Sequence, residues 1–151
     1  QRSINLMPIV SEVQGTKSVS ALRCTAGLSL YATAGSGGIR GNISSTSGRA
    51  FVVSANEFYE INTDGTSTLR GTLNTQTNRV MIAESKPEIL IVDGADGWIF
   101  TKATNTFTQI TDPDFTANGN AEVVVFVDGY FVFNGYTVIF SENKFSRINV
   151  K

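Results

Sequence analysis

The stretch Glu122–Val150, EVVVFVDGYFVFNGYTVIFSENKFSRINV, predicts four short antiparallel strands in succession. Its apolar or alternating segments are each of strand length, and Asp128-Gly129, Asn134-Gly135 and a later polar turn separate them. Asp-Gly and Asn-Gly are strong hairpin signals, because the tightest chain reversals need a positive backbone φ. This part of the chain therefore reads as a β-meander.

The same four-strand pattern occurs twice more toward the N-terminus. The three units are Gly38–Leu73, Asn78–Thr111 and Ala121–Val150. Matching aromatic-rich strands are 40 and 39 residues apart (99 − 59, 138 − 99), measured at Tyr59, Ile99 and Val138. The final strands of the units are 39 and 39 residues apart (108 − 69, 147 − 108), measured at Leu69, Thr108 and Arg147. A period of roughly 40–50 residues with four strands per unit is typical of propeller blades. We therefore expect an all-β fold, a partial β-propeller of about three four-stranded antiparallel blades.

Residues 1–36 differ from these repeats and are expected to form an N-terminal extended arm with an edge strand. The propeller segment then covers residues 37–151, with blades at 38–73, 78–111 and 121–150. Within the arm, the period-two alternation of Leu28–Ala32 predicts a strand. Because propellers usually close with four to eight blades, three blades predict that more chain or more subunits complete the ring.

Position within a blade predicts which side chains are buried. Near-continuous apolar strands such as Ile89–Val92 and Val123–Val127 are expected to be covered on both faces by neighbouring blades. Phe107–Ile110 alternates and fits a half-exposed outer edge. Most aromatic residues are assigned to packing, with Trp98 the best suited to surface binding because it opens a strand after a turn. The arginines are expected to be isolated, solvated charges: Arg40, Arg49, Arg70, Arg79 and Arg147.

Composition excludes several kinds of chemistry. The 151 residues contain no histidine, which removes Ser-His-Asp and Cys-His catalysis and imidazole zinc sites. Cys24 is the only cysteine, so no intramolecular disulfide is possible, and we expect it to be a small buried residue. The net charge of −1 provides no global basic field for nucleic acid. No apolar run approaches the roughly 18 residues of a membrane span, so no membrane contact is expected.

Carboxylates concentrate in the predicted turns and are the candidates for calcium ligands: Asp93, Asp96, Asp112 and Asp114. Neither group has the complete 12-residue calcium-loop spacing, and Asp also favours turns because its side chain bonds local backbone amides. A glycosidase dyad drawn from these residues is a further possibility. No catalytic or cofactor-binding residue, and no cofactor, is predicted.

The chain also resembles the packaged-DNA stabilisation proteins of short-tailed phages. The likeness covers most of Gln1–Phe133. It is carried by Asn5-Leu6-Met7-Pro8, Leu22–Leu28, Ile39-Arg40-Gly41, Phe51–Ser54, Ile61–Thr66, Ile91–Gly94 and Phe107–Phe115. Cys24 and Ala26 replace a Gly and a Pro of the family pattern. The similarity fades after Phe133, and family members are several times longer, so the chain is expected to be a truncated or diverged member.

This resemblance implies a non-enzymatic tail hub or head-completion component at the portal vertex of the virion, made in the host cytoplasm. Its expected partners are portal and tail proteins and further copies of itself in a ring, with at most indirect contact with packaged DNA. The repeats alone leave open a carbohydrate- or small-ligand-binding β-propeller module that assembles as an oligomer. A propeller hydrolase is the third hypothesis.

Overall fold

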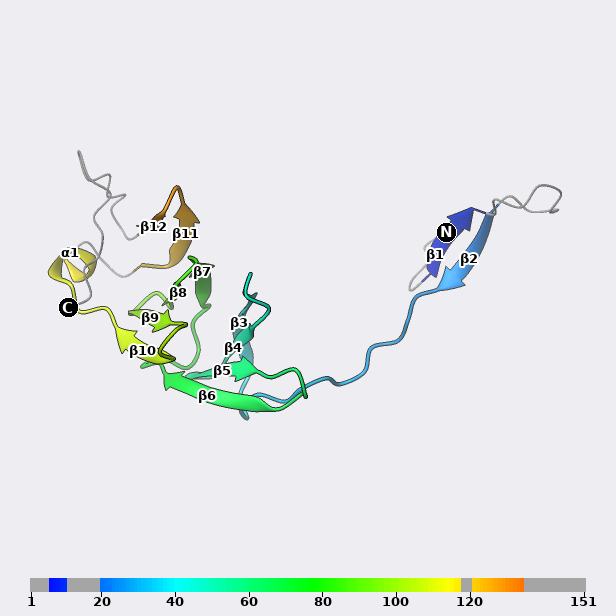
Figure 1. Ribbon diagram of the computed structural model, residues 1–151, viewed down its shortest axis with the longest axis horizontal. Coiled ribbons are helices and arrows are strands. Elements are labelled where there is room, and N and C mark those ends of the chain that lie inside the picture. The colour runs from blue at the N-terminus through cyan, green and yellow to red at the C-terminus, as the bar shows by residue number, and fades with distance from the viewer. Residues whose placement is uncertain (1–5, 11–19, 118–120, 135–151) are drawn as a thin grey trace. The chain divides into compact units, whose positions relative to one another are not determined.

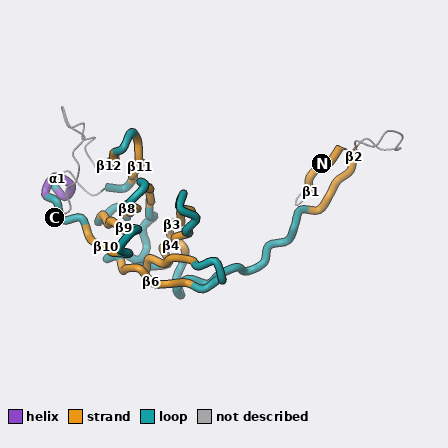
Figure 2. The backbone as a smooth tube through the Cα atoms, in the orientation of Figure 1, coloured by secondary structure: helices purple, strands orange, loops and turns teal. Residues whose placement is uncertain are grey.

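The computed structural model describes residues 6–10, 20–117 and 121–134, and its contacts divide the chain into two units, Gln1–Tyr31 and Ala32–Lys151. In these ranges the regular structure is almost entirely β, as the orange segments of Figure 2 show. The single helical segment described there is one turn, α1 (Pro113–Thr116). The all-β prediction is confirmed.

The N-terminal unit contains an antiparallel hairpin of β1 (Leu6–Val10) and β2 (Ser20–Cys24). Residues 25–34 form no regular structure, so the strand predicted at Leu28–Ala32 is wrong. Leu28 and Leu30 are 105% and 85% exposed, so no described segment buries them, and no described strand pairs with this stretch. Alternation alone does not make a strand when no neighbouring strand supplies the hydrogen-bonding ladder.

Two complete four-stranded antiparallel sheets form the body of the second unit (Figure 1). Both are meanders whose strands pair in chain order. Blade 1 consists of β3 (Ile39–Ser44), β4 (Ala50–Ser54), β5 (Glu57–Ile61) and β6 (Ser67–Thr72). Blade 2 consists of β7 (Met81–Glu84), β8 (Glu88–Val92), β9 (Gly97–Thr101) and β10 (Thr106–Gln109). All strands of blade 1 lie within residues 38–73 and all strands of blade 2 within residues 78–111.

A third sheet begins with β11 (Val123–Val127) and β12 (Tyr130–Asn134), which pair antiparallel. Asp128 and Gly129 join them with φ values of 49° and 88°, the paired positive angles of the tight hairpin turn predicted at this dipeptide. The two later strands expected in this unit lie outside the described residues. The first strands of successive sheets are neighbours, β3 beside β7 and β7 beside β11, as in a propeller.

An aromatic core joins blade 1 to blade 2. Phe58 lies 5.5 Å from Phe51, 5.4 Å from Phe100 and 5.3 Å from Phe107, measured between ring centroids. Phe51 and Phe58 come from blade 1 and the other two rings from blade 2. Such rings each bury roughly 150–250 Å² and gain further from offset or edge-on contact. This core fixes the blades face to face.

A second core covers the opposite face of blade 2. Leu90, Val92 and Ile99 pack there with Val124 of β11. The predicted burial of Ile89–Val92 on both faces is therefore confirmed. The same prediction is wrong for Val123–Val127, where Val124 is buried but the other four side chains are 38–52% exposed. Among the described residues, only one face of β11 meets another sheet.

The structure also corrects the alignment of the repeats. Ile99 belongs to the core shared with β11, whereas Tyr59, matched to it at a spacing of 40, neighbours Phe58, which faces blade 2. Because side chains alternate along a strand, a one-residue shift moves a residue to the other face. A spacing of 39 instead matches Glu60 with Ile99 (99 − 60) and Tyr59 with Trp98 (98 − 59). The two residues of each match then lie on the equivalent face of their sheets.

Trp98 is accordingly part of the core rather than of a binding surface. It is 8% exposed, and its ring stacks on Phe107 with centroids 5.1 Å apart. The general assignment of the aromatic residues to packing holds for Trp98, and its greater suitability for surface binding, inferred from the preceding turn, is not borne out. Its position after a turn does not expose it, because its face of β9 is covered by blade 1.

Gly71 sets how closely the two blades approach, and this gives a first testable prediction. A Cβ at position 71 would lie 2.0 Å from the Phe107 ring. Gly71→Ala is therefore expected to displace Phe107 and to lower the free energy of unfolding by about 1–3 kcal/mol, measured by urea denaturation. Gly38→Ala is the matched control, because its Cβ would meet nothing within 4 Å. Equal stability of the two variants would contradict this role.

Candidate functional site

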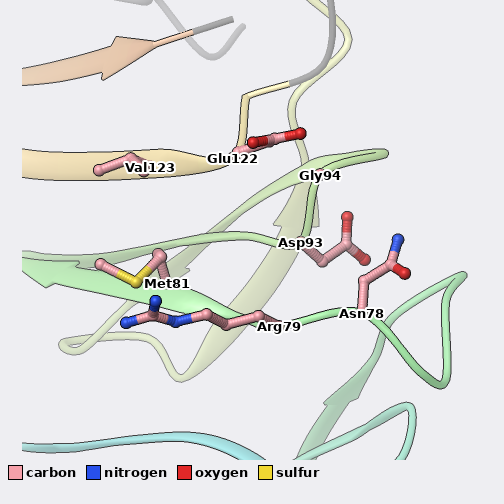
Figure 3. Close-up of a pocket in the computed structure, with 7 residues that line it drawn as sticks. All are labelled: Asn78, Arg79, Met81, Asp93, Gly94, Glu122 and Val123. Atoms are coloured by element: carbon pink, nitrogen blue, oxygen red, sulfur yellow. The ribbon is translucent and has the colours of Figure 1, made fainter.

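A pocket of about 350 Å³ lies where blade 2 meets β11 (Figure 3). Its walls come from the residues that lead into β7 and its first residue, from the turn between β8 and β9, and from the residue before β11 and its first residue. The lining residues are Asn78, Arg79, Met81, Asp93, Gly94, Glu122 and Val123. The volume falls at the lower end of the range for ligand pockets, about 300–1,000 Å³. The pocket is the candidate functional site.

Two opposite charges face this pocket from different sheets. In Figure 3 the Arg79 side chain extends alongside Met81, and the Glu122 carboxylate lies on the β11 side and points in a different direction. Both residues are exposed. Within the described part of the chain, neither side chain forms an ion pair or a hydrogen bond. The site can therefore offer both a cation and an anion to a ligand.

Asp93 forms the rigid base of the site. It is fully buried, and its Oδ1 accepts hydrogen bonds from the backbone N–H groups of Ala95 (3.0 Å) and Asp96 (2.7 Å). Its Oδ2 accepts a bond from the Thr75 hydroxyl. Gly94 N donates to Ala121 O at 3.1 Å and ties the turn to the residues that lead into β11. The carboxylate thus fixes the turn by which two sheets meet.

The candidate calcium ligands are placed as follows. Asp96 accepts bonds from Asn74 (2.8 Å) and Gln109 (2.9 Å), and Asp112 directly precedes α1. The side chain of Asp114 lies outside the described residues. Within the described ranges, no three His, Cys, Asp or Glu side chains group in a way that could hold a metal ion. The contacts of Asp93 and Asp96 are those of residues that stabilise turns.

Arg40 connects this end of blade 1 to the base of the pocket. Its guanidinium donates to the carbonyls of Ala55 (2.7 Å), Thr75 (2.6 Å) and Asn78, and also to the Thr75 hydroxyl (2.7 Å). Burial lowers the pKa of Arg40 from its ordinary value, and the negative charge of Asp93 opposes that shift. Thr75 bridges the two charges. Arg40 is therefore a structural link and not an isolated, solvated charge.

The Arg-Gly step makes this link possible. The ladder between β3 and β4 shifts register between Ile39 and Gly41, so that Arg40 is the extra residue of a bulge. Bulges re-aim a side chain, here toward the connection between the blades. A Cβ on Gly41 would lie 2.9 Å from the Val80 carbonyl oxygen, so only glycine allows this approach. The Arg40-Gly41 dipeptide was therefore the feature of the sequence that could have pointed to this hydrogen-bond network.

Glu84 holds the opposite end of the same two blades together. From β7 it accepts hydrogen bonds from Ser45, from the backbone of Thr46 (3.0 Å) and from the Lys102 ammonium (2.5 Å). Burial disfavours the charged carboxylate, but these bonds outweigh it and lower the pKa of Glu84 to about 2. Ser45 and Thr46 belong to the β3–β4 turn of blade 1. The carboxylate therefore joins both blades at this end.

A third network surrounds Glu60. Its carboxylate pairs with Arg49 and with Arg70, each at 2.7 Å, and hydrogen bonding from Arg49 lowers the pKa of Glu60. Arg49 also donates to Lys102 O (3.0 Å) and to Asn105 Oδ1 (2.6 Å) of blade 2. Its guanidinium lies 5.1 Å and 5.6 Å from the rings of Phe51 and Phe100.

The prediction that the arginines are isolated charges is thus wrong for Arg40, Arg49 and Arg70. Each lies in a strand or turn close to a carboxylate or to several backbone carbonyls. These partners are distant in the sequence, so the positions of the arginines along the chain do not predict the contacts. Arg79 is exposed, as expected. Arg147 lies outside the described residues.

Cys24 ends β2 and is exposed, so the prediction that it is buried is wrong. Leu22, on the same strand of this two-stranded hairpin, is exposed as well. No helix among the described residues is long and apolar enough to cross a membrane.

Comparison with known proteins gives a family for the chain as a whole. A family model described as bacteriophage P22 Gp10, beta-propeller, a phage stabilisation family, matches residues 1–144. The match includes all residues that the structure describes, and so the whole of the pocket. No curated protein matches the chain.

Arg40 supplies a second testable prediction. Arg40→Gln removes several charge-assisted hydrogen bonds and leaves the carbonyls of Ala55 and Thr75 without these donors. We expect the free energy of unfolding to fall by about 2–3 kcal/mol, measured by chemical denaturation. Arg79→Gln is the matched control and should change stability by less than about 0.5 kcal/mol. A similar small effect for both variants would show that the Arg40 network does not stabilise the blades.

Glu84 supplies a third, dependent on pH. Its pKa is about 2 in the folded protein against an ordinary 4.5, so its contribution is complete above pH 4.5 and is lost as the pH falls toward 2. Glu84→Gln should lower stability at pH 7 by on the order of 2 kcal/mol and flatten the decline between pH 4.5 and 2. Thermal denaturation across this pH range measures both effects. If Glu84→Gln kept the same acid sensitivity as a Glu88→Gln control, the assignment would fail.

Proposed function

Because the chain belongs to the bacteriophage P22 Gp10 β-propeller family, a family of phage structural proteins, we propose that it is a non-enzymatic component of the virion. In this proposal it completes the head at the portal vertex, helps to retain the packaged DNA and carries other tail proteins. The match over residues 1–144 is the observation that carries the proposal. It also confirms the family resemblance seen in the sequence, and it continues past Phe133, where the similarity was expected to fade.

The stacking of the blades supports a scaffold role. Glu84 at one end and Arg40 at the other join elements that are about one repeat apart in the chain. Between them lies the aromatic core of Phe51, Phe58 and Phe100. A structural component benefits from dense packing, because close-packed interiors have low compressibility. The observed contacts meet that requirement.

Exposed apolar side chains support assembly with other proteins. On β11, Val125 and Val127 are 46% and 52% exposed, and in the N-terminal hairpin Met7 and Leu22 are 53% and 62% exposed. A two-stranded hairpin is at best marginally stable alone in water. We therefore infer portal and tail proteins, and further copies of this chain in a ring, as partners. With a net charge of −1, any contact with DNA is indirect in this proposal.

The carbohydrate-binding alternative has less support. Trp98, the aromatic residue judged best suited to surface binding, is buried between the blades, and the matched family is one of phage structural proteins. The scaffold proposal is therefore the one that we develop.

The function is testable with DNA-filled heads assembled without this protein. We expect the purified protein to sediment with such heads and to protect their DNA from added nuclease. Heads that lack the portal vertex are the control and should bind little protein. Failure to sediment with complete heads, together with a monomeric mass in native mass spectrometry, would contradict the proposal.

A further inference from the structure

We propose that the pocket between β7, the β8–β9 turn and β11 binds a peptide segment of another virion protein. The segment presents an acidic group to Arg79 and a basic group to Glu122. This inference rests on the proposed function and adds the place and the chemistry of one docking contact. The geometry of the pocket carries it.

The first argument is the state of the charges. In the described part of blades 1 and 2, most partly buried charges have partners, as the contacts of Glu84, Glu60 and Arg49 show. Arg79 and Glu122 have none among the described residues, although they line one pocket from two sheets. Exposed single charges are common, but two opposite ones that face a shared cavity form a complementary surface for a dipolar partner.

The second argument is the character of the space between them. Met81 and Val123 contribute apolar surface, and Val123 is 39% exposed. Charged groups flanking apolar side chains match an extended polypeptide, whose side chains alternate in direction and can combine a charged contact with an apolar one. Methionine adapts well to such contacts because its side chain is unbranched and polarizable. A nucleic acid strand fits less well, because Glu122 and Asp93 would repel its phosphates.

The third argument is that the backbone of the pocket is held before any partner arrives. Asp93 fixes the β8–β9 turn through two backbone amides, and Gly94 bonds to Ala121 at the start of the third sheet. Arg40 and Thr75 in turn hold Asp93. Binding to a preorganised surface loses less conformational entropy, so modest contacts suffice for affinity. Asn78 contributes both its carbonyl to Arg40 and its side chain to the wall.

The inference is tested by charge removal in the binding assay with DNA-filled heads. Arg79→Gln and Glu122→Gln should each weaken binding at least 3-fold, and the double variant about 10-fold or more. Wild-type binding should weaken between 0.15 M and 1 M salt, and the double variant should lose most of that dependence. Lys86→Gln and Glu88→Gln provide a matched control, because they remove an opposite pair of charges near the β7–β8 turn, at the other end of β7.

Photo-cross-linking identifies the occupant. A benzophenone amino acid in place of Asn78, at the pocket wall, should cross-link within assembled particles to a peptide that contains both an acidic and a basic residue. The same group in place of Lys86 should not label that peptide. A cross-link to this peptide and the loss of affinity together support the inference.

The outcomes separate this inference from the proposed function. If wild type and the double variant bind heads equally well, with folding confirmed by circular dichroism, the pocket is not a docking site and the virion role stands. A cross-link from position 78 to DNA alone would also overturn the peptide assignment. If wild type itself does not bind heads, both proposals fail.

Discussion

The face-to-face packing of blade 1 on blade 2 is the constraint on which the rest of the structure depends. Both faces of β8 are buried, so its central residues must all be apolar, and Ile89–Val92 are at most 1% exposed. A sheet covered on both sides also has no face on which to place charges. The linked charges Arg40, Glu84 and Glu60 lie at the end of a strand or one residue from it.

Those strand ends show how the fold accommodates charge. A buried ionic group is costly unless hydrogen bonds replace its lost hydration. Glu84 receives bonds from a hydroxyl, an amide and an ammonium, and Arg40 reaches three carbonyls. Each network includes groups from both blades. The hydrogen bonds that offset the cost of desolvating the charge therefore also fix the spacing of the blades. Arg40 and Thr75 hold Asp93, and Asp93 fixes the β8–β9 turn that forms one wall of the pocket beside the third sheet.

Most of the fold could be read from the sequence, because turns and alternation are local signals. Asp128-Gly129 marks a turn by its own chemistry, and the predicted apolar strand Ile89–Val92 coincides with all but the first residue of β8. The site could not be read in this way. The partners of Arg40 lie 15 to 38 residues away, and Glu122 reaches the pocket only because β11 packs beside β7. Which face a residue takes also depends on a single-residue register, as Tyr59 shows.

The links between the blades have a consequence for how the chain folds. The Arg40–Thr75 and Ser45–Glu84 contacts close loops of 35 and 39 residues, about one repeat each. Closing such a loop costs little more entropy than closing a shorter one, since the cost grows only with the logarithm of its length. Each blade can thus be completed against its immediate predecessor, without waiting for distant parts of the sequence. A chain leaving the ribosome can add blades in order, and the pair formed by blades 1 and 2 already carries the Arg40 and Glu84 links.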